Sequence, residues 1–165
     1  MDLGSGIWVT TKYLNHPILC LGYRFEYKGK VFCTAYDTEP FRNVFPTDPD
    51  DPDYDSDAAE EGEKAAREEN ERVWNFLRGA DLLIHDSQYT RHEYVTGKTG
   101  WGHSYFEWVI NSANKAGVKK LLLFHHDPMR TDEELTRLHE YYLSLVKGKT
   151  DMEIAIARER EEIIL

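Results

Sequence analysis

Histidine and aspartate recur where the apolar, strand-like stretches of this sequence end. Leu121 to Phe124 is an apolar run typical of a strand buried on both faces, and His125-His126-Asp127-Pro128 follows it directly. Three further stretches end the same way, at His16-Pro17, at Asp37, and at His85-Asp86-Ser87. His103 follows a glycine-rich loop, Gly97 to Gly102. Side chains at strand ends are held rigidly, so we expect His16 and Asp37 to converge on His125 in space.

Imidazole and carboxylate together favour a metal site, because Zn²⁺, Mn²⁺ and Fe accept mixed nitrogen and oxygen donors. A carboxylate such as Asp37 can bridge two ions, and histidines can complete each shell. Two such ions would lower the pKa of a bound water and hold the oxygens of a phosphoryl or acyl substrate. The histidines are dispersed and form no HExxH pattern, so surface or core roles stay open for them.

Other catalytic classes fit the sequence less well. Ser104 lacks a GxSxG elbow, and neither cysteine is close to a histidine in sequence. Gly97-Lys98-Thr99-Gly100 lacks the GxxxxGK[ST] pattern and the preceding strand of a phosphate loop.

The elements that must position these residues alternate between strand and helix patterns. We predict strands over 7–13, 20–27, 30–36, 80–84, 118–124 and 153–157, with a hairpin turn at Lys28-Gly29. Residues 163–165 are a candidate continuation of the last strand. Helices are predicted over 58–77, 105–116 and 131–146, with Gly79 and Gly117 ending the first two and a Thr131–Glu134 capping box beginning the third. Leu135, Leu138, Tyr142 and Leu145 form the apolar face of the third helix. The fold class is α/β, or layered α+β, in one domain spanning 1–165.

The net charge of −10 comes almost entirely from one segment. Residues 47–72 carry twelve acids and three bases, which leaves a net of −1 for the remaining residues. The segment reads as an exposed Asp/Pro-rich loop followed by a mostly solvated helix, an acidic insert. Such charge argues against non-specific binding of polyanions, though not against one anionic substrate in a metal site.

Composition and targeting signals predict a cytoplasmic protein. The apolar runs are too short to span a bilayer, and residues 1–6 show no signal peptide, so we expect no membrane association. Cys20 and Cys33 form no CxxC pair and are expected to be free thiols.

A series of ordered motifs resembles the second half of a metallo-β-lactamase-fold hydrolase, in its ribonuclease Z and phosphodiesterase-like branch. The similarity covers nearly the whole chain from about Trp8, apart from the acidic insert, and rests on His16-Pro17, 21–24 (LGYR), 36–39 (YDTE), 80–86 (ADLLIHD), 100–104 (GWGHS), 123–128 (LFHHDP) and 155–159 (AIARE).

The resemblance implies a role for each polar position. His16 is similar to the histidine that completes the first metal shell, Asp37 to the bridging aspartate, and His125 to the last histidine of the second metal. His103 resembles the histidine that contacts the scissile phosphate or acts as general acid, and Asp86 the carboxylate paired with it. For Asp86 and His126 a structural role is an equal alternative. His85, His92 and His139 match nothing in the family and are expected on the surface or in the core.

The resemblance also implies a two-metal phosphodiesterase, with Zn²⁺, or Mn²⁺ or Fe as alternatives. A metal-bound hydroxide would attack a small phosphodiester or nucleotide-like substrate, with RNA as a further option. The family's HxHxDH motif, which supplies most ligands, is absent, and no HxH occurs in the sequence. We therefore expect the C-terminal half of the family's αββα sandwich, a mixed sheet with helices on one face, as a fragment or truncated member.

This half alone would be weakly active or inactive, because each metal keeps only two protein ligands. It would expose the sheet face that a partner covers, and pair with a second copy or with a missing N-terminal half. The alternative function is a catalytically inactive binding or assembly module that uses this face.

Overall fold

A single six-stranded sheet runs through the computed structural model, which describes residues 1–165. Its order is β1-β2-β3-β4-β5-β6, so every strand pairs with its neighbour in sequence. The first three strands are antiparallel, and the last four are parallel from β3 to β6. The strands are β1 (Trp8–Tyr13), β2 (Leu21–Tyr27), β3 (Lys30–Ala35), β4 (Leu82–Asp86), β5 (Lys120–Phe124) and β6 (Glu153–Ile156).

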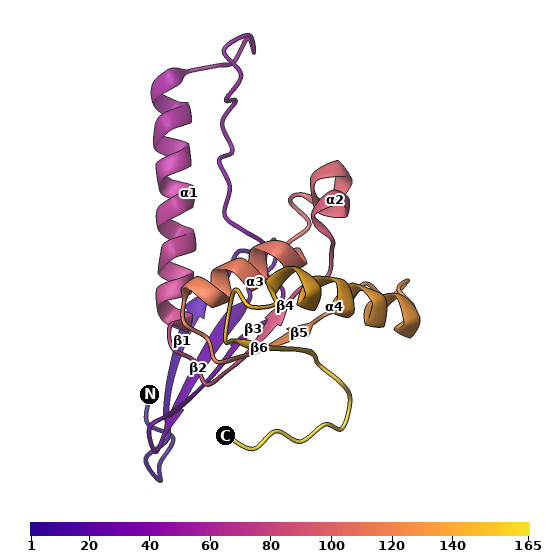
Figure 1. Cartoon of the computed structure of the whole chain (residues 1–165). Helices are drawn as coiled ribbons and strands as arrows, with labels where there is room; N and C mark the ends of the chain where they lie inside the picture. The colour runs from indigo at the N-terminus through magenta and orange to yellow at the C-terminus, as the bar shows by residue number, and fades with distance from the viewer.

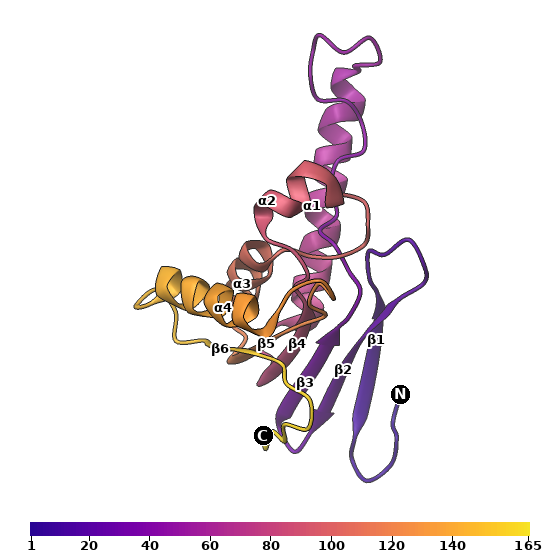
Figure 2. The same cartoon turned by 90° about the vertical axis from the view of Figure 1, so that its right-hand side faces the viewer.

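Helices α1, α3 and α4 lie on one side of this sheet, and the chain after β6 lies below it in Figure 1. They are α1 (Ser56–Leu77), α3 (Phe106–Lys115) and α4 (Asp132–Val146). The short α2 (Arg91–Glu93) continues into a wider turn, η1 (Tyr94–Lys98), which Gly97 interrupts with a non-helical backbone. The first half of α1 and the acidic loop before it project away from the sheet, as Figures 1 and 2 show. None of the helices combines the length and apolar composition that a membrane crossing requires.

The core lies between the sheet and the helices, and strand alternation decides which side chains enter it. Cys33, Leu83, Leu121 and Leu123 face the helices and are fully buried. The parallel strands β4 and β5 therefore have the continuous apolar sequence that burial on both faces requires. At the end of β4, His85 points to the helix side and Asp86 to the other.

The opposite face of the sheet is only partly covered. Register places Phe25, Phe32, Ile84, Leu122 and Phe124 on this face, and residues 157–163 of the tail cross part of it. Tyr23, Tyr27 and Phe124 remain about two-fifths exposed. The expected mixed sheet, with helices on one face and an apolar face left open, is confirmed.

The predicted helices and strands are confirmed, apart from the ends of some elements and the absence of a strand at 163–165. The hairpin turn uses Lys28 and Gly29, both with positive φ, and Thr131 and Glu134 form the capping box of α4. On the predicted apolar face of α4, Tyr142 is buried in the core and Leu138 packs against it, whereas Leu145 near the end of the helix is 42% exposed. Residues 163–165 form no strand, and β4 extends two residues further than predicted, so that His85 and Asp86 belong to it.

Candidate metal and acid–base site

Four acidic and imidazole side chains meet where the parallel strands end. Asp37 lies just after β3, Asp86 ends β4, His125 lies just after β5, and His103 comes from the loop before α3. One potential ligand atom from each of the four lies within 4.8 Å of the others. Parallel strands bring their carboxyl ends to one edge, which is why residues nearly 90 positions apart converge here.

Asp86 and His103 form the most tightly held pair of the site. The Nδ1–H of His103 donates to Oδ2 of Asp86 at 2.6 Å, and Asp86 is fully buried. The carboxylate also accepts backbone N–H groups of Thr38, Gln88 and Ser104, at 3.1, 3.2 and 3.3 Å. These four hydrogen bonds hold the carboxylate in one orientation, and the carboxylate in turn orients the His103 ring. Nε2 of that ring stays free.

This pairing shifts the acid–base behaviour of His103. The hydrogen bond to Asp86 raises the pKa of His103 above its ordinary value, against the opposing effect of partial burial. The imidazolium form is favoured, with Nδ1–H on Asp86 and the second proton on Nε2. A group whose protonated form is favoured and whose second N–H is free and oriented is suited to general acid chemistry.

Asp37 and His125 form the second pair of the site. His125 Nε2 lies 3.3 Å from Oδ1 of Asp37, and both side chains are about one-third exposed. Both residues have positive φ, 38° for Asp37 and 58° for His125. Non-glycine residues in this region are uncommon and cost about 1–3 kcal/mol each, which is typical of functional positions.

His16 lies beside this cluster, although its ring nitrogens fall outside the group of four. The His16 ring packs edge-to-face on His103 at 5.4 Å, and His103 stacks on His125 at 4.6 Å. Gly102 makes room for His16: a Cβ built at Gly102 would lie 2.3 Å from its Cδ2. The structure therefore brings all five predicted side chains to one place, with His16 on the rim.

The loop that presents His103 is fixed by a buried carboxylate. Glu39 Oε2 accepts the hydroxyl of Tyr94 at 2.9 Å and the N–H of Gly100 at 2.8 Å. The Ser104 hydroxyl donates to the carbonyl of Thr38 at 2.6 Å, so the segment after Asp37 holds both ends of this loop. Sequence reasoning missed Glu39 as a support, since only the tertiary contact distinguishes it from other acids.

The remaining histidines are not among the group of four. His85 is buried and stacks on Trp74 at 5.5 Å, and His139 lies with Nε2 3.0 Å from the carbonyl of Ile154. Both are structural, and His92 is exposed. His126 has neither ring nitrogen hydrogen-bonded, and burial lowers its pKa.

The donor set fits a divalent metal ion in part. Asp37 and His125 supply one carboxylate and one imidazole, which Zn²⁺ or Mn²⁺ accepts. Gln88 lies beside His125, with its amide nitrogen 3.4 Å from Nδ1, while Gln88 Oε1 is buried without a partner. If the Gln88 amide is turned by 180°, its Oε1 can accept the Nδ1–H of His125. The Nε2 lone pair of His125 then faces Asp37, which is the orientation of a metal-ligating histidine. Two donors leave a tetrahedral site incomplete, so further ligands must come from water or from another segment.

Comparison with known proteins supports this picture of the fold. No protein-family model matches the chain. It is 37% identical over 67 residues, 41% of its length, to ribonuclease Z of Brevibacillus brevis, of which the match covers 21%. The metallo-beta-lactamase fold protein YhfI of Bacillus subtilis matches 95% of the chain with TM-score 0.60 and 18% identity. Human tRNase Z, short form, matches 99% of it with TM-score 0.59 and 18% identity.

The chain spans 49% and 44% of those two solved structures, about half their length. The predicted resemblance is thus confirmed, in overall structure by both solved relatives and in local sequence by ribonuclease Z. This chain has the metallo-β-lactamase fold and spans about half the length of the two solved structures. Over 67 residues its sequence is similar to that of ribonuclease Z.

Proposed function

We propose that this chain carries the acid–base part and two metal ligands of a metal-dependent phosphodiester hydrolase. The observation that carries the proposal is the Asp86–His103 pair, held at 2.6 Å beside Asp37 and His125. A phosphodiester hydrolysis needs a proton for the leaving oxygen, and His103 holds one at Nε2. The local similarity to ribonuclease Z supports a phosphodiester in RNA or a smaller nucleotide-like compound as substrate.

Asp37 and His125 would hold a divalent ion, Zn²⁺ or Mn²⁺, and the second carboxylate oxygen of Asp37 would be available to another ion. When bound, the ion supplies charge neutralisation for the phosphate and an acidified water as nucleophile. Asp86 keeps His103 in one tautomer and one orientation throughout. The stacking of His103 on His125 keeps the proton donor next to the ligand pair.

Hydrolysis of bis-p-nitrophenyl phosphate in the presence of Mn²⁺ or Zn²⁺ tests this proposal. His103→Gln should lower turnover by about a hundredfold or more, the usual contribution of a general acid, while leaving metal affinity unchanged. Asp127→Asn changes an acid in the loop after β5 that is outside the group of four, and it is the control. Turnover that is equal in wild type and His103→Gln would contradict the assigned role.

A second candidate function, assembly through the open sheet face, is favoured by the aromatic side chains there. Tyr23, Phe25 and Phe32 stack in a row, and Tyr36 packs on Phe124. Exposed apolar patches of this kind mark interaction surfaces. Sedimentation velocity tests it: a dimer or larger species supports assembly, and a monomer at high concentration without metal argues against it.

A further inference from the structure

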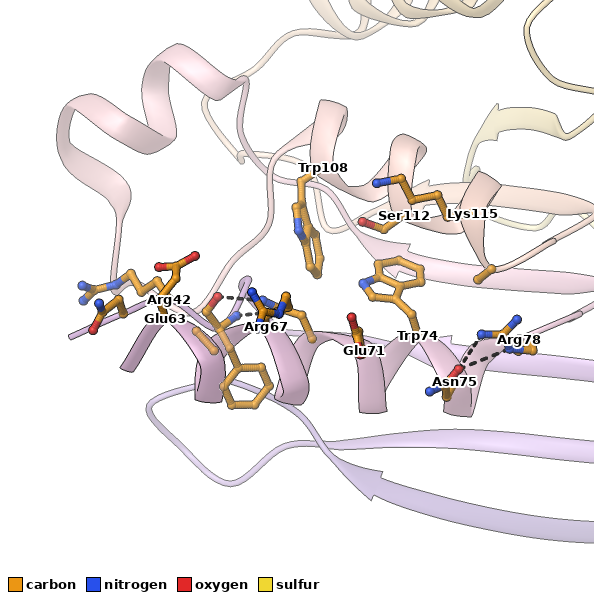
Figure 3. A pocket seen from close by; sticks show the side chains of 15 residues that line it. Arg42, Glu63, Arg67, Glu71, Trp74, Asn75, Arg78, Trp108, Ser112 and Lys115 are labelled. Carbon is orange, nitrogen blue, oxygen red and sulfur yellow. Dashed lines mark hydrogen bonds between the residues drawn. The ribbon is translucent and has the colours of Figure 1, made fainter. Parts of the chain in front are cut away.

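A groove between α1 and α3 lies on the helix side of the sheet, away from the Asp86–His103 pair. It has a volume of about 680 Å³, within the range of small-ligand sites. Figure 3 shows Trp74 of α1 and Trp108 of α3 next to each other between the two helices, with Arg67 on one side of them. Arg42 lies toward one end of the groove and Arg78 toward the other.

The lining comes from two helical stripes that face each other. On α1, Arg67, Glu71 and Trp74 follow spacings of four and three, and Arg78 comes directly after the helix ends. On α3, Trp108, Ser112 and Lys115 follow spacings of four and three. Such spacing places each set on one face of its helix. Both stripes therefore present indole and cationic groups to the same space.

The charge of the groove is opposite to that of the protein. Arg42, Arg67, Arg78 and Lys115 line it together with only two acids, Glu63 and Glu71, although the chain has a net charge of −10. None of the four cations forms a salt bridge within the chain, although Arg78 donates to Oδ1 of Asn75, with its Nε at 3.2 Å. Unpaired cations gathered on one groove in an acidic protein favour an anionic ligand.

The wall of the groove is rigidly built. The Asn70 side chain accepts the N–H of Phe41 at 2.9 Å and donates to its carbonyl at 2.8 Å, which fixes the extended segment 41–43 on α1. Asn43 donates to the carbonyl of Ala59 at 2.8 Å. Gly62 permits this contact, because a Cβ there would overlap the Asn43 side chain. The groove thus keeps its shape without a ligand.

We propose that this groove binds a nucleoside phosphate, with the base beside Trp108 and Trp74 and the phosphate on the cations that flank this pair, Arg67 on one side and Lys115 on the other. His85 covers one face of Trp74, which leaves Trp108 as the main stacking surface. Indole faces stack on any base, and guanidinium and ammonium groups bind phosphate oxygens. The unit can be a free mononucleotide or one nucleotide of a single-stranded RNA. The proposal does not rest on the phosphodiesterase function, because no residue of the Asp86–His103 site lines the groove.

Isothermal titration of the full chain with adenosine monophosphate, in EDTA to keep metal out of the other site, tests the proposal. Arg67→Gln/Lys115→Gln removes two exposed cations from the groove and should weaken binding by about tenfold or more. Lys64→Gln/Lys147→Gln removes two equally exposed cations outside it and should leave binding unchanged. Equal losses in both pairs would overturn the proposal.

Ribose 5-phosphate, which lacks the base, tests the stacking part without any change to the protein. It should bind about tenfold more weakly than adenosine monophosphate, the usual contribution of one stacked base. Trp108→Leu, which keeps an apolar side chain against the core, should abolish that difference. Equal affinity for both ligands in the wild type would overturn the assignment of a nucleoside.

A hexanucleotide of adenosine separates the two sources of the ligand. If the hexanucleotide binds much more tightly than the mononucleotide, and Arg67→Gln/Lys115→Gln removes this tight binding, the source is RNA. Equal or tighter binding of the mononucleotide identifies the free nucleotide. Failure of both ligands to bind would overturn the proposal, while hydrolysis of bis-p-nitrophenyl phosphate by the same Arg67→Gln/Lys115→Gln variant would still report on the other site.

Discussion

The imidazole of His103 donates to the carboxylate of Asp86 at 2.6 Å, and the other hydrogen-bond donors to this carboxylate are backbone N–H groups. The two residues are seventeen positions apart and come from the end of β4 and the loop before α3. Their pairing fixes which nitrogen of His103 is free and links strand, loop and proton donor into one unit.

Asp86→Asn should lower the pKa of His103 toward or below its ordinary value, because the hydrogen bond to the carboxylate is the main cause of its elevation. It should also reduce the free energy of unfolding by about 3 kcal/mol, since the amide cannot accept all the buried donors. Titration of the His103 ring signals by NMR in EDTA checks the first effect. Asp127→Asn is the control, and an unchanged His103 pKa in Asp86→Asn would contradict the assigned cause.

The pH dependence of stability separates His103 from His85. The pKa of His103 is raised, so its contribution is fully present below about pH 6.5 and is lost as pH rises through the folded-state value. Burial lowers the pKa of His85, so its effect has the opposite sign: stability is lost as pH falls below about 6.5. Urea unfolding from pH 5 to 9 should show a flatter acidic limb in His85→Leu and a flatter alkaline limb in His103→Gln. The reverse pattern would contradict both shifts.

Gly102→Ala should destabilise the protein more than Gly100→Ala. Both glycines have φ near 87°, so each alanine costs about 1 kcal/mol of backbone strain. At Gly102 the new Cβ also meets His16 and Pro17, at 2.3 and 2.5 Å, whereas at Gly100 its nearest neighbour is Arg42 at 3.5 Å. Urea unfolding should therefore show an additional loss of about 1–3 kcal/mol for Gly102→Ala. Equal losses would show that His16 is not held against this loop.

Most of the fold could be predicted from sequence because its elements carry strong local signals. The apolar run Leu121–Phe124, the turn at Lys28-Gly29 and the capping box at Thr131 each depend on residues close together in the chain. Polar residues at strand ends also predicted where the chemistry gathers, since parallel strands share one edge.

The contacts that complete the site could not be predicted in the same way. That Glu39 fixes the Gly100 loop, or that Gln88 adjoins His125, depends on long-range packing that leaves no local pattern. The cationic groove could not be predicted either. Residues 47–72 are strongly acidic overall, and no local pattern shows that Arg67 of α1 and Trp108 of α3 line the same groove. Its helical spacing on α1 and α3 was the available signal.

Direct titration of the chain with Zn²⁺ by calorimetry tests the central claim, that Asp37 and His125 hold a divalent ion beside the Asp86–His103 pair. The account predicts binding by the wild type, a loss of about tenfold or more in affinity for Asp37→Ala and for His125→Ala, and no change for the exposed control His92→Ala. Zn²⁺ affinity that is equal in the wild type and in both site variants would contradict it.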